Sequence, residues 1–196
     1  MGRIILITGG ARSGKSRFAE EYAKRYSEKH GGSVAYIATA EVYDDEMAFR
    51  VKLHRKRRPS SWTTFEAPKD ADKVLDRAKK EHNIVLFDCL TIYVSNMLCD
   101  IGDITDSDLN YRTVMEKIGL LMDAAKNTDG ISIFVTNEVG AGIVPANHLS
   151  REYRDVAGIA NQYVAKKADE VWLVACGLPI NIKEISKRST ELWQSI

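Results

Sequence analysis

Residues 9–16 constrain this chain more than any other stretch, because they read G-G-A-R-S-G-K-S directly after a run of β-branched residues. Every fixed position of the pattern G-x-x-x-x-G-K-[ST] is met. The glycines allow a tight turn whose N–H groups converge on phosphate oxygens, and the following helix presents its positive N-terminal end. The pattern therefore predicts a strand over Arg3–Thr8, a helix over Lys15–Ser27, and a nucleoside triphosphate bound on the P-loop between them.

Three side chains have separate expected roles at this nucleotide site. Lys15 is expected to reach the β- and γ-phosphates, and Ser16 to ligate Mg²⁺. Asp88 closes the apolar run Ile84–Phe87, a position from which a carboxylate usually reaches the same metal through water. The alternatives are a glycine-rich turn that binds nothing and an aspartate that caps the next helix.

Short apolar runs alternate with longer amphipathic stretches along the whole chain. Further strands are predicted at 34–39, 62–67, 84–87, 131–135 and 170–175. Helices are predicted at 44–57, 70–82, 90–99 and 151–167, with another around 114–125 and a polar loop at 102–107. This order predicts an α/β fold in which a mostly parallel sheet is flanked by helices, with residues 1–196 forming a single P-loop domain.

Composition excludes several classes of protein. The 28 Lys and Arg residues nearly balance the 27 Asp and Glu residues, which gives no reason to expect bulk nucleic-acid or membrane-surface binding. The three cysteines, Cys89, Cys99 and Cys176, lack the spacing of a disulfide framework or a zinc site and favour a reducing compartment. No apolar run approaches the roughly 20 residues of a membrane span. A cytoplasmic globular protein is therefore expected.

A basic stretch around one histidine allows two interpretations. Arg50, His54 and Arg57 fall on one face of the helix expected over 44–57. They could belong to a solvated basic helix with an incidental histidine. Alternatively, a neutral His54 imidazole could attack a phosphorus atom while neighbouring cations stabilise the developing charge. Spacing alone leaves both open. The other histidines, expected to be structural or solvent-exposed, are His30, His82 and His148.

The segment T-N-E-V-G-A-G-I-V-P at 136–145 follows the strand expected at 131–135. A loop at the carboxyl end of a parallel strand lies on the ligand-binding edge of such a sheet. Its two glycines allow close backbone approach, and Asn137 and Glu138 supply polar contacts. We favour a substrate-binding loop over an ordinary strand-to-helix connection.

Taken together, these segments resemble a known family. The elements that carry the resemblance are 9–16, Y-I-A-T-A at 36–40, D-D-E-M at 44–47, His54 with Arg58-Pro59, D-C-L-T at 88–91, T-N-E-V-G and G-I-V-P within 136–145, and Arg154-Asp155 with Gly158. In this order they are similar to the bifunctional adenosylcobinamide kinase/adenosylcobinamide-phosphate guanylyltransferases of cobalamin synthesis. The match reaches about Lys183, and the tail beyond it carries no recognisable motif.

The resemblance implies a RecA-like P-loop fold, a homotrimer and a two-step reaction. The enzyme would phosphorylate adenosylcobinamide with ATP or GTP, and would then transfer GMP from GTP to that phosphate through a GMP–histidine intermediate on His54. Mg²⁺ would be held by Ser16 and Asp88. The implied nucleotide contacts are Gly9, Gly10, Ala11, Arg12, Ser13, Gly14, Lys15, Ser16, Ala38, Thr39, Ala40, Arg55, Lys56, Arg57, Arg58, Glu66 and Asp88.

Two rival functions share the P-loop. One is a kinase of another small alcohol, in which His54 is incidental. The other is a nucleotide-dependent switch, in which Lys15 and Ser16 bind nucleotide but no metabolite is modified. No simple sequence signature marks a corrinoid site, so the sequence does not exclude either directly.

Overall fold

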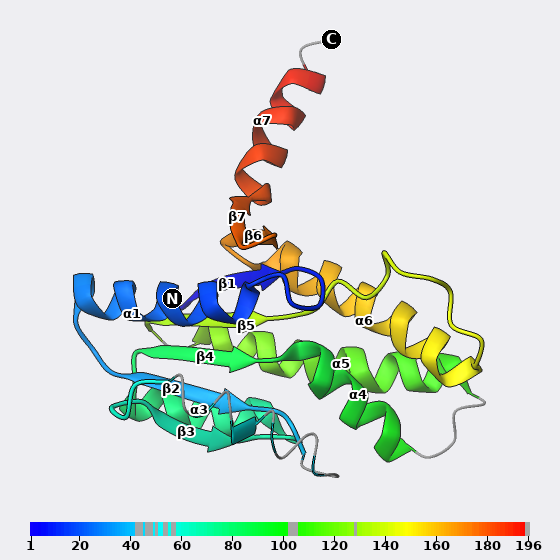
Figure 1. Ribbon diagram of the computed structural model, residues 1–196, viewed down its shortest axis with the longest axis horizontal. Coiled ribbons are helices and arrows are strands. Elements are labelled where there is room, and N and C mark those ends of the chain that lie inside the picture. Colours follow the sequence, from blue (N-terminus) through cyan, green and yellow to red (C-terminus); the bar gives the residue numbers. More distant parts are fainter. Residues whose placement is uncertain are drawn as a thin grey trace.

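A computed structural model describes residues 1–41, 45, 49, 51–52, 55, 58–101, 106–127 and 129–194, with side chains as far as Ser189 (Figure 1). Within these residues the strands form one seven-stranded sheet of order β3-β2-β4-β5-β1-β6-β7. The strands are β1 (Arg3–Thr8), β2 (Val34–Ala38), β3 (Thr63–Glu66), β4 (Ile84–Asp88), β5 (Ile131–Val135), β6 (Glu170–Ala175) and β7 (Leu178–Asn181).

Neighbouring strands from β3 through to β6 are parallel, and the β6–β7 pair alone among the described pairings is antiparallel. Parallel neighbours need crossover connections, which the intervening helices supply. The predicted mostly parallel sheet is confirmed. The helices are α1 (Lys15–His30), α3 (Ala71–Glu81), α4 (Leu90–Ile101), α5 (Ser107–Asn127), α6 (His148–Lys167) and α7 (Ile182–Gln194).

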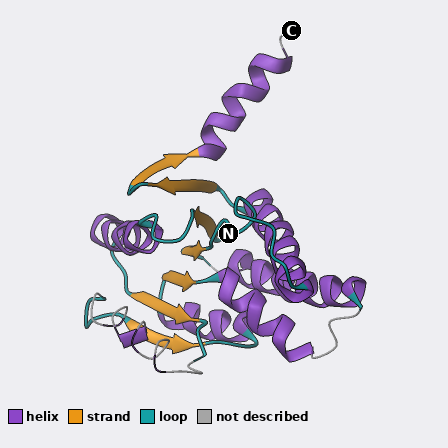
Figure 2. Cartoon of the chain, turned by 45° about the vertical axis from the view of Figure 1, so that its right-hand side comes forward, coloured by secondary structure: helices purple, strands orange, loops and turns teal. Residues whose placement is uncertain are grey.

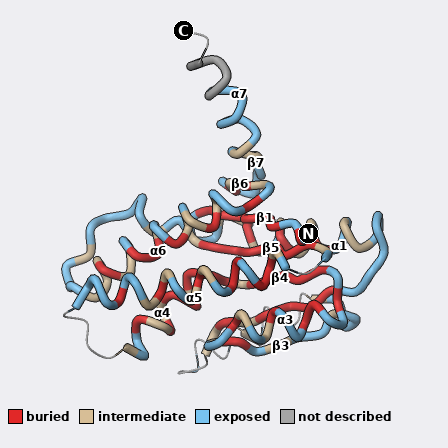
Figure 3. The backbone as a smooth tube through the Cα atoms, turned by 180° about the vertical axis from the view of Figure 1, so that it is seen from behind, coloured by how far each residue is buried: buried red, intermediate tan, exposed pale blue. Residues whose placement is uncertain are grey.

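Both faces of the sheet are covered. On β1, Ile4 and Leu6 pack with α3, α4, α5 and α6 on one face, whereas Ile5 and Ile7 pack with α1 on the other. All four of these side chains are at most 1% exposed. Figure 3 shows the same pattern, with the central strands buried and the outer surfaces of the helices exposed. Continuous apolar strands arise because each side chain of a central parallel strand meets a helix.

Two helices begin earlier than the sequence predicted. Helix α6 starts at His148 rather than residue 151, because Asn147 caps it by accepting a hydrogen bond from the Ser150 backbone N–H at 2.7 Å. Helix α5 starts at Ser107, inside the stretch predicted as a loop, where Asp106 accepts from the Leu109 N–H at 2.9 Å. The capping residues set where these two helices begin. Both helices begin before the apolar periodicity that the sequence prediction relied on.

The basic helix is described in part. Asp45, Phe49, Val51, Lys52 and Arg55 are helical, in agreement with the helix predicted over 44–57. The described residues do not include Asp44, Arg50, His54, Lys56 and Arg57.

The C-terminal hairpin and helix were not predicted. Cys176 and Gly177, with φ of 52° and 80°, form the tight turn between β6 and β7. Helix α7 then projects away from the rest of the molecule (Figures 1 and 2). Over the described residues, no helix combines the length and apolar character needed to cross a membrane.

Candidate active site

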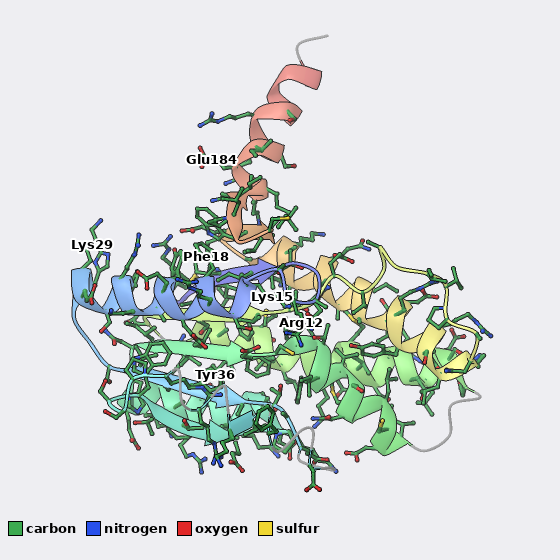
Figure 4. All side chains as sticks on the ribbon, in the orientation of Figure 1. Arg12, Lys15, Phe18, Lys29, Tyr36 and Glu184 are labelled. Carbon is green, nitrogen blue, oxygen red and sulfur yellow. The ribbon has the colours of Figure 1, made fainter. Side chains whose placement is uncertain are left out.

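The P-loop joins β1 to α1, as the motif predicted. Lys15 is 9% exposed, and its Nζ donates to the carbonyl oxygen of Gly10 within the loop at 3.1 Å. Figure 4 shows it at the start of α1, beside the tip of β1. Burial lowers the pKa of Lys15, while the nearby Cys89 and Asp88 side chains oppose that shift. The ammonium group is thus held at the carboxyl edge of the sheet, where a phosphate chain would meet it.

Two of the motif glycines have a steric reason to be glycine. A Cβ on Gly9 would lie 2.4 Å from the Val174 carbonyl oxygen and 2.6 Å from Ser13 Oγ. Gly14 has a φ of 96°, in the left-handed region that other residues rarely adopt. The motif therefore fixes the loop conformation through backbone geometry.

Neighbouring loops brace the P-loop on both sides. The backbone N–H of Glu138, after β5, donates to the Gly9 carbonyl at 3.1 Å. The N–H of Gly177, in the β6–β7 turn, donates to the Ser13 carbonyl at 2.8 Å. The second brace comes from the hairpin that the sequence did not reveal.

Strand register brings three predicted site residues into one row. Ala38 on β2 is paired with Glu66 on β3 on one side and with Asp88 on β4 on the other. The row continues through Val135 on β5 to Ile7 on β1, two residues before the P-loop. Residues that are far apart in sequence therefore meet at one edge of the sheet.

Asp88 is anchored by a residue whose role the sequence did not reveal. The Tyr36 hydroxyl donates to Asp88 Oδ2 at 2.9 Å from a position that is 2% exposed. Burial, and secondarily the Asp88 charge, raise the pKa of Tyr36 well above its ordinary value, so the phenol stays a donor. The described partner of the Asp88 carboxylate thus comes from β2, and no cap of α4 by Asp88 is seen.

Arg58 packs on the other side of this tyrosine. Its guanidinium carbon lies 3.2 Å from the centroid of the Tyr36 ring. Its Nε and Nη1 atoms are buried and have no hydrogen-bond partner in the described part of the chain. Burial lowers the pKa of Arg58, and Tyr36 and Asp88 act in the opposite direction. We refer to Tyr36, Arg58 and Asp88 together as the Asp88 corner.

Three further predicted contacts, Arg55, Glu66 and Thr39, have partners within the described part of the chain. Arg55 and Glu66 are exposed and form an ion pair of 2.5 Å, which ties the basic helix to β3. Thr39 is fully buried, and its hydroxyl accepts from the Cys89 N–H at 2.8 Å and donates to the Cys89 carbonyl at 2.9 Å. Its backbone is occupied too, since its N–H donates to the Asp88 carbonyl and its own carbonyl accepts from Asn96. Thr39 therefore joins the ends of β2 and β4.

In the loop at 136–145, some side chains form hydrogen bonds within the protein and others face solvent. Asn137 donates to Thr91 Oγ1 at 2.8 Å, and its carbonyl accepts from Asn161 at 3.0 Å. The Glu138 side chain is exposed and lines a cleft. Asn137 thus braces the loop, and Glu138 faces the space beside it.

Among the remaining histidines and cysteines, His82 has structural contacts, whereas Cys89 lies at the site itself, since it follows Asp88 directly and its backbone is hydrogen-bonded to Thr39. His82 packs against Phe65 and lies 2.8 Å from Ser33 Oγ, as expected of a structural histidine. The three cysteines are free, and burial raises the pKa of Cys89 to about 11. Among the described residues, no group of three or more His, Cys, Asp or Glu side chains could hold a metal ion.

Solved structures support the fold assignment. A KaiC-like protein from Pyrococcus horikoshii OT3 superposes with a TM-score of 0.51 at 13% identity, covering 88% of this chain and 70% of that one. At this identity the similarity concerns the fold alone. It agrees with the predicted P-loop fold of RecA type.

Sequence comparison is far more specific. The bifunctional adenosylcobalamin biosynthesis protein CobU of Escherichia coli K12 is 42% identical over 185 residues, which is 92% of this chain and 99% of that protein. CobU of Salmonella typhimurium LT2 is 40% identical over the same shares. CobP of Pseudomonas aeruginosa PAO1 is 40% identical over 179 residues, 91% of this chain and 96% of that protein.

The family model for cobinamide kinase / cobinamide phosphate guanyltransferase matches residues 5–182. This range contains the P-loop, the Asp88 corner and the 136–145 loop, and leaves almost all of α7 outside. The resemblance found in the sequence is confirmed, and with it the prediction of a nucleotide-using enzyme of cobalamin biosynthesis. The chain belongs to the cobinamide kinase / cobinamide phosphate guanylyltransferase family.

Proposed function

We propose that this chain phosphorylates adenosylcobinamide and then transfers GMP from GTP to the product, with both steps at the carboxyl edge of the sheet. The observation that carries the proposal is the alignment of the P-loop with the row of Glu66, Ala38 and Asp88 along that edge. One triphosphate on this edge would be cut at its γ-phosphorus in the first step, and a second triphosphate, GTP, would be cut at its α-phosphorus in the second step.

In the kinase step the protein mainly positions and stabilises charge. The corrinoid hydroxyl oxygen bonds to the γ-phosphorus, and the bond to the β–γ bridging oxygen breaks. Lys15 would neutralise charge on the transferring phosphoryl group and on the departing diphosphate. Its burial supports this assignment, because electrostatic interactions strengthen where water is excluded.

Ser16 and Asp88 fit a magnesium ion. A hydroxyl and a carboxylate are oxygen donors of the kind Mg²⁺ prefers, and nucleotide phosphates and waters complete its shell in such sites. The hydrogen bond from the Tyr36 hydroxyl is accepted by Asp88 Oδ2, and we assign Asp88 Oδ1 to the ion. When bound, the ion would neutralise charge that develops on the phosphate oxygens.

In the guanylyl step we assign His54 as the nucleophile. An imidazole nitrogen would bond to the α-phosphorus while the bond to the α–β bridging oxygen breaks and pyrophosphate leaves. An oxygen of adenosylcobinamide phosphate would then attack the same phosphorus, breaking the P–N bond and freeing His54. His54 itself lies outside the described residues.

The described contacts next to His54 support this assignment. Arg55 is paired with Glu66, and Arg58 is stacked on Tyr36, so two described residues that follow His54 in the sequence are tied to the edge that bears Asp88. Two unpartnered nitrogens of Arg58 leave donors for phosphate oxygens. The remaining nucleotide contacts inferred from the resemblance, such as Lys56 and Arg57, belong to the same proposal.

Labelled GTP tests the two-step scheme. The chain is incubated with Mg²⁺ and GTP labelled at the α-phosphate, and in parallel at the γ-phosphate, with and without adenosylcobinamide. We expect acid-labile α-label on the protein, its chase onto adenosylcobinamide phosphate, and its absence in His54→Ala. We also expect γ-label on adenosylcobinamide in both proteins, because His54 takes no part in the kinase step.

Each other outcome selects a rival. Label transferred only from the γ-position would favour a kinase alone, and binding without any transfer would favour a switch. Protein labelling that persists in His54→Ala would assign the nucleophile to another residue.

We further propose that the chain works as a homotrimer in the cytoplasm, where its nucleotide substrates are made. The projecting β7–α7 segment supports assembly, since Leu178, Ile180 and Ile185 on it are 69%, 47% and 53% exposed. Light scattering should give three times the chain mass of 21.9 kDa. A monomer at micromolar concentration would contradict the trimer.

A further inference from the structure

A cleft of about 650 Å³ lies beside the P-loop, between α6 and the loop that follows β5. Glu138, Gly140 and Gly142 line it from the loop, and Arg154 and Gly158 line it from α6. The cleft adjoins the proposed nucleotide site, because the backbone N–H of Glu138, which lines the cleft, donates a hydrogen bond to the carbonyl of Gly9 in the P-loop. A molecule in this cleft would therefore lie next to the phosphate chain.

The cleft is lined by both polar and apolar side chains, which suits an amphiphilic molecule. Val144 and Ile159 contribute apolar surface and are 61% and 39% exposed. Thr8 lines the cleft at the end of β1, is 7% exposed, and has a hydroxyl without a partner within the described part of the chain. A buried hydroxyl without a partner is costly, and a polar ligand group would satisfy it.

Gly158 is a second independent sign that something approaches this surface of α6. Among the described residues, a Cβ at this position would meet no atom within 4 Å, and the residue needs no left-handed conformation. Glycine inside a helix costs about 0.5–1 kcal/mol relative to alanine. The part of the chain that the structure describes thus gives no steric reason for glycine here, whereas a bulky ligand lying on the helix would.

The two reactions of the family place different demands on a base. In the kinase step the acceptor is an alcohol, whose proton must leave as the O–P bond forms. In the guanylyl step the acceptor is a phosphate monoester, which is already largely ionised at neutral pH. A proton-accepting side chain at the acceptor site is therefore needed in the first step alone.

Glu138 is the carboxylate best placed for that task. The other carboxylate lining the cleft, Asp155, is paired with Arg154 at 3.1 Å. Asp88 lies in the other corner of the site, where it accepts from Tyr36. The Glu138 side chain has a long contact with its own loop, 3.4 Å from the Gly140 N–H to Oε1, and is exposed on the cleft.

We propose that this cleft binds the corrinoid acceptor and that Glu138 is the general base of the kinase step. The hydroxyl proton passes to the Glu138 carboxylate as the oxygen bonds to the γ-phosphorus and the nucleoside diphosphate leaves. Thr8 and Asn161 are polar residues of the lining, and Val144 and Ile159 offer apolar surface to the macrocycle. This inference rests on the two family activities and adds the acceptor site to them.

Glu138→Gln separates the two steps. Kinase activity is measured with adenosylcobinamide and γ-labelled ATP, and guanylyl transfer with pre-formed adenosylcobinamide phosphate and α-labelled GTP. We expect the kinase kcat to fall about 100-fold, the range of a lost general base, while guanylyl transfer changes less than about threefold. Glu138→Asp should recover part of the kinase rate. The matched control is Glu28→Gln, an exposed glutamate on α1, for which both rates should equal those of the native chain.

Gly158→Leu tests the cleft itself. The new side chain enters open space on a helix, so the melting temperature should not fall. The KM for the corrinoid should rise at least about tenfold in both reactions, while the affinity for GTP stays the same, and Gly158→Ala should give a smaller rise.

Three results would overturn the proposal. Equal losses of both activities in Glu138→Gln would make Glu138 a structural residue of the loop. An unchanged kinase rate would remove it from the chemistry. An unchanged corrinoid KM in a folded Gly158→Leu would put the acceptor elsewhere. A failure of the two-step function would be distinct, since the native chain would then lack one reaction altogether.

Discussion

The P-loop and the Asp88 corner form the two ends of the proposed nucleotide site, and they are built in opposite ways. The P-loop is made of eight consecutive residues whose shape depends on backbone geometry at Gly9 and Gly14. The Asp88 corner is made of side chains from residues 36, 58 and 88, which are joined by one hydrogen bond and one stacking contact. A local backbone structure leaves one contiguous motif in the sequence, whereas a side-chain assembly is divided among segments whose contacts the sequence does not show.

The two ends also meet different neighbours. The P-loop is held by backbone hydrogen bonds from the loops after β5 and β6. The Asp88 corner holds the end of the basic helix through Arg58, whose Nε and Nη1 have no described partner. We infer that the P-loop fixes the phosphates, and that the Asp88 corner orients the side chains that act on them.

Replacement of Lys15 should give the larger effect. Lys15→Ala removes the buried ammonium group from the P-loop, and we expect the kinase kcat/KM to fall by at least about 1000-fold through lost charge stabilisation. Steady-state assays with γ-labelled ATP would measure this. Lys24→Ala on the same helix, where the lysine is exposed, is the control and should retain full activity. If the Lys15→Ala enzyme kept native kinase activity, the P-loop would not be the phosphate-binding site of the kinase step.

Replacement of Tyr36 should give a smaller effect that reaches both reactions. Tyr36→Phe keeps the ring under Arg58 but leaves Asp88 Oδ2 without its donor. Loss of a hydrogen bond to a charged group should cost about 1–3 kcal/mol and lower both kcat values about tenfold, because Asp88 would no longer be held in place. Urea unfolding and the two transfer assays measure these effects.

A second tyrosine provides the matched control for Tyr36. Tyr22 donates to Glu170 Oε2 at 3.0 Å, away from the Asp88 corner. Tyr22→Phe should therefore lower stability by a similar amount and leave both transfer rates unchanged. If both tyrosine variants lost activity equally, the loss would follow from stability, and the Asp88 corner would have no separate function.

Most of the secondary structure could be predicted from the sequence because its causes are local. Mostly apolar runs at 3–8, 84–87 and 131–135 became central strands, since a strand covered by helices on both faces buries side chains on both sides. The short apolar strand β7 was missed because it lies at an edge, where Leu178 and Ile180 remain exposed. Helix α7 was missed because its described side chains, as far as Ser189, include no buried one that would mark its periodicity.

By itself, the sequence determined the P-loop, the order of strands and helices along the chain as far as β6, and the family. These depend on residue types at short spacing, where chain connectivity fixes the geometry. Only the tertiary structure decided that Tyr36 holds Asp88, that Arg58 stacks on that tyrosine, and that the β6–β7 turn braces Ser13. It also decided that Glu138 and Gly158 line one cleft. These pairings join segments separated by 20 to 164 residues, as the numbers of Glu138 and Gly158 and of Ser13 and Gly177 show. Strand register and packing, rather than any local pattern, bring such residues together.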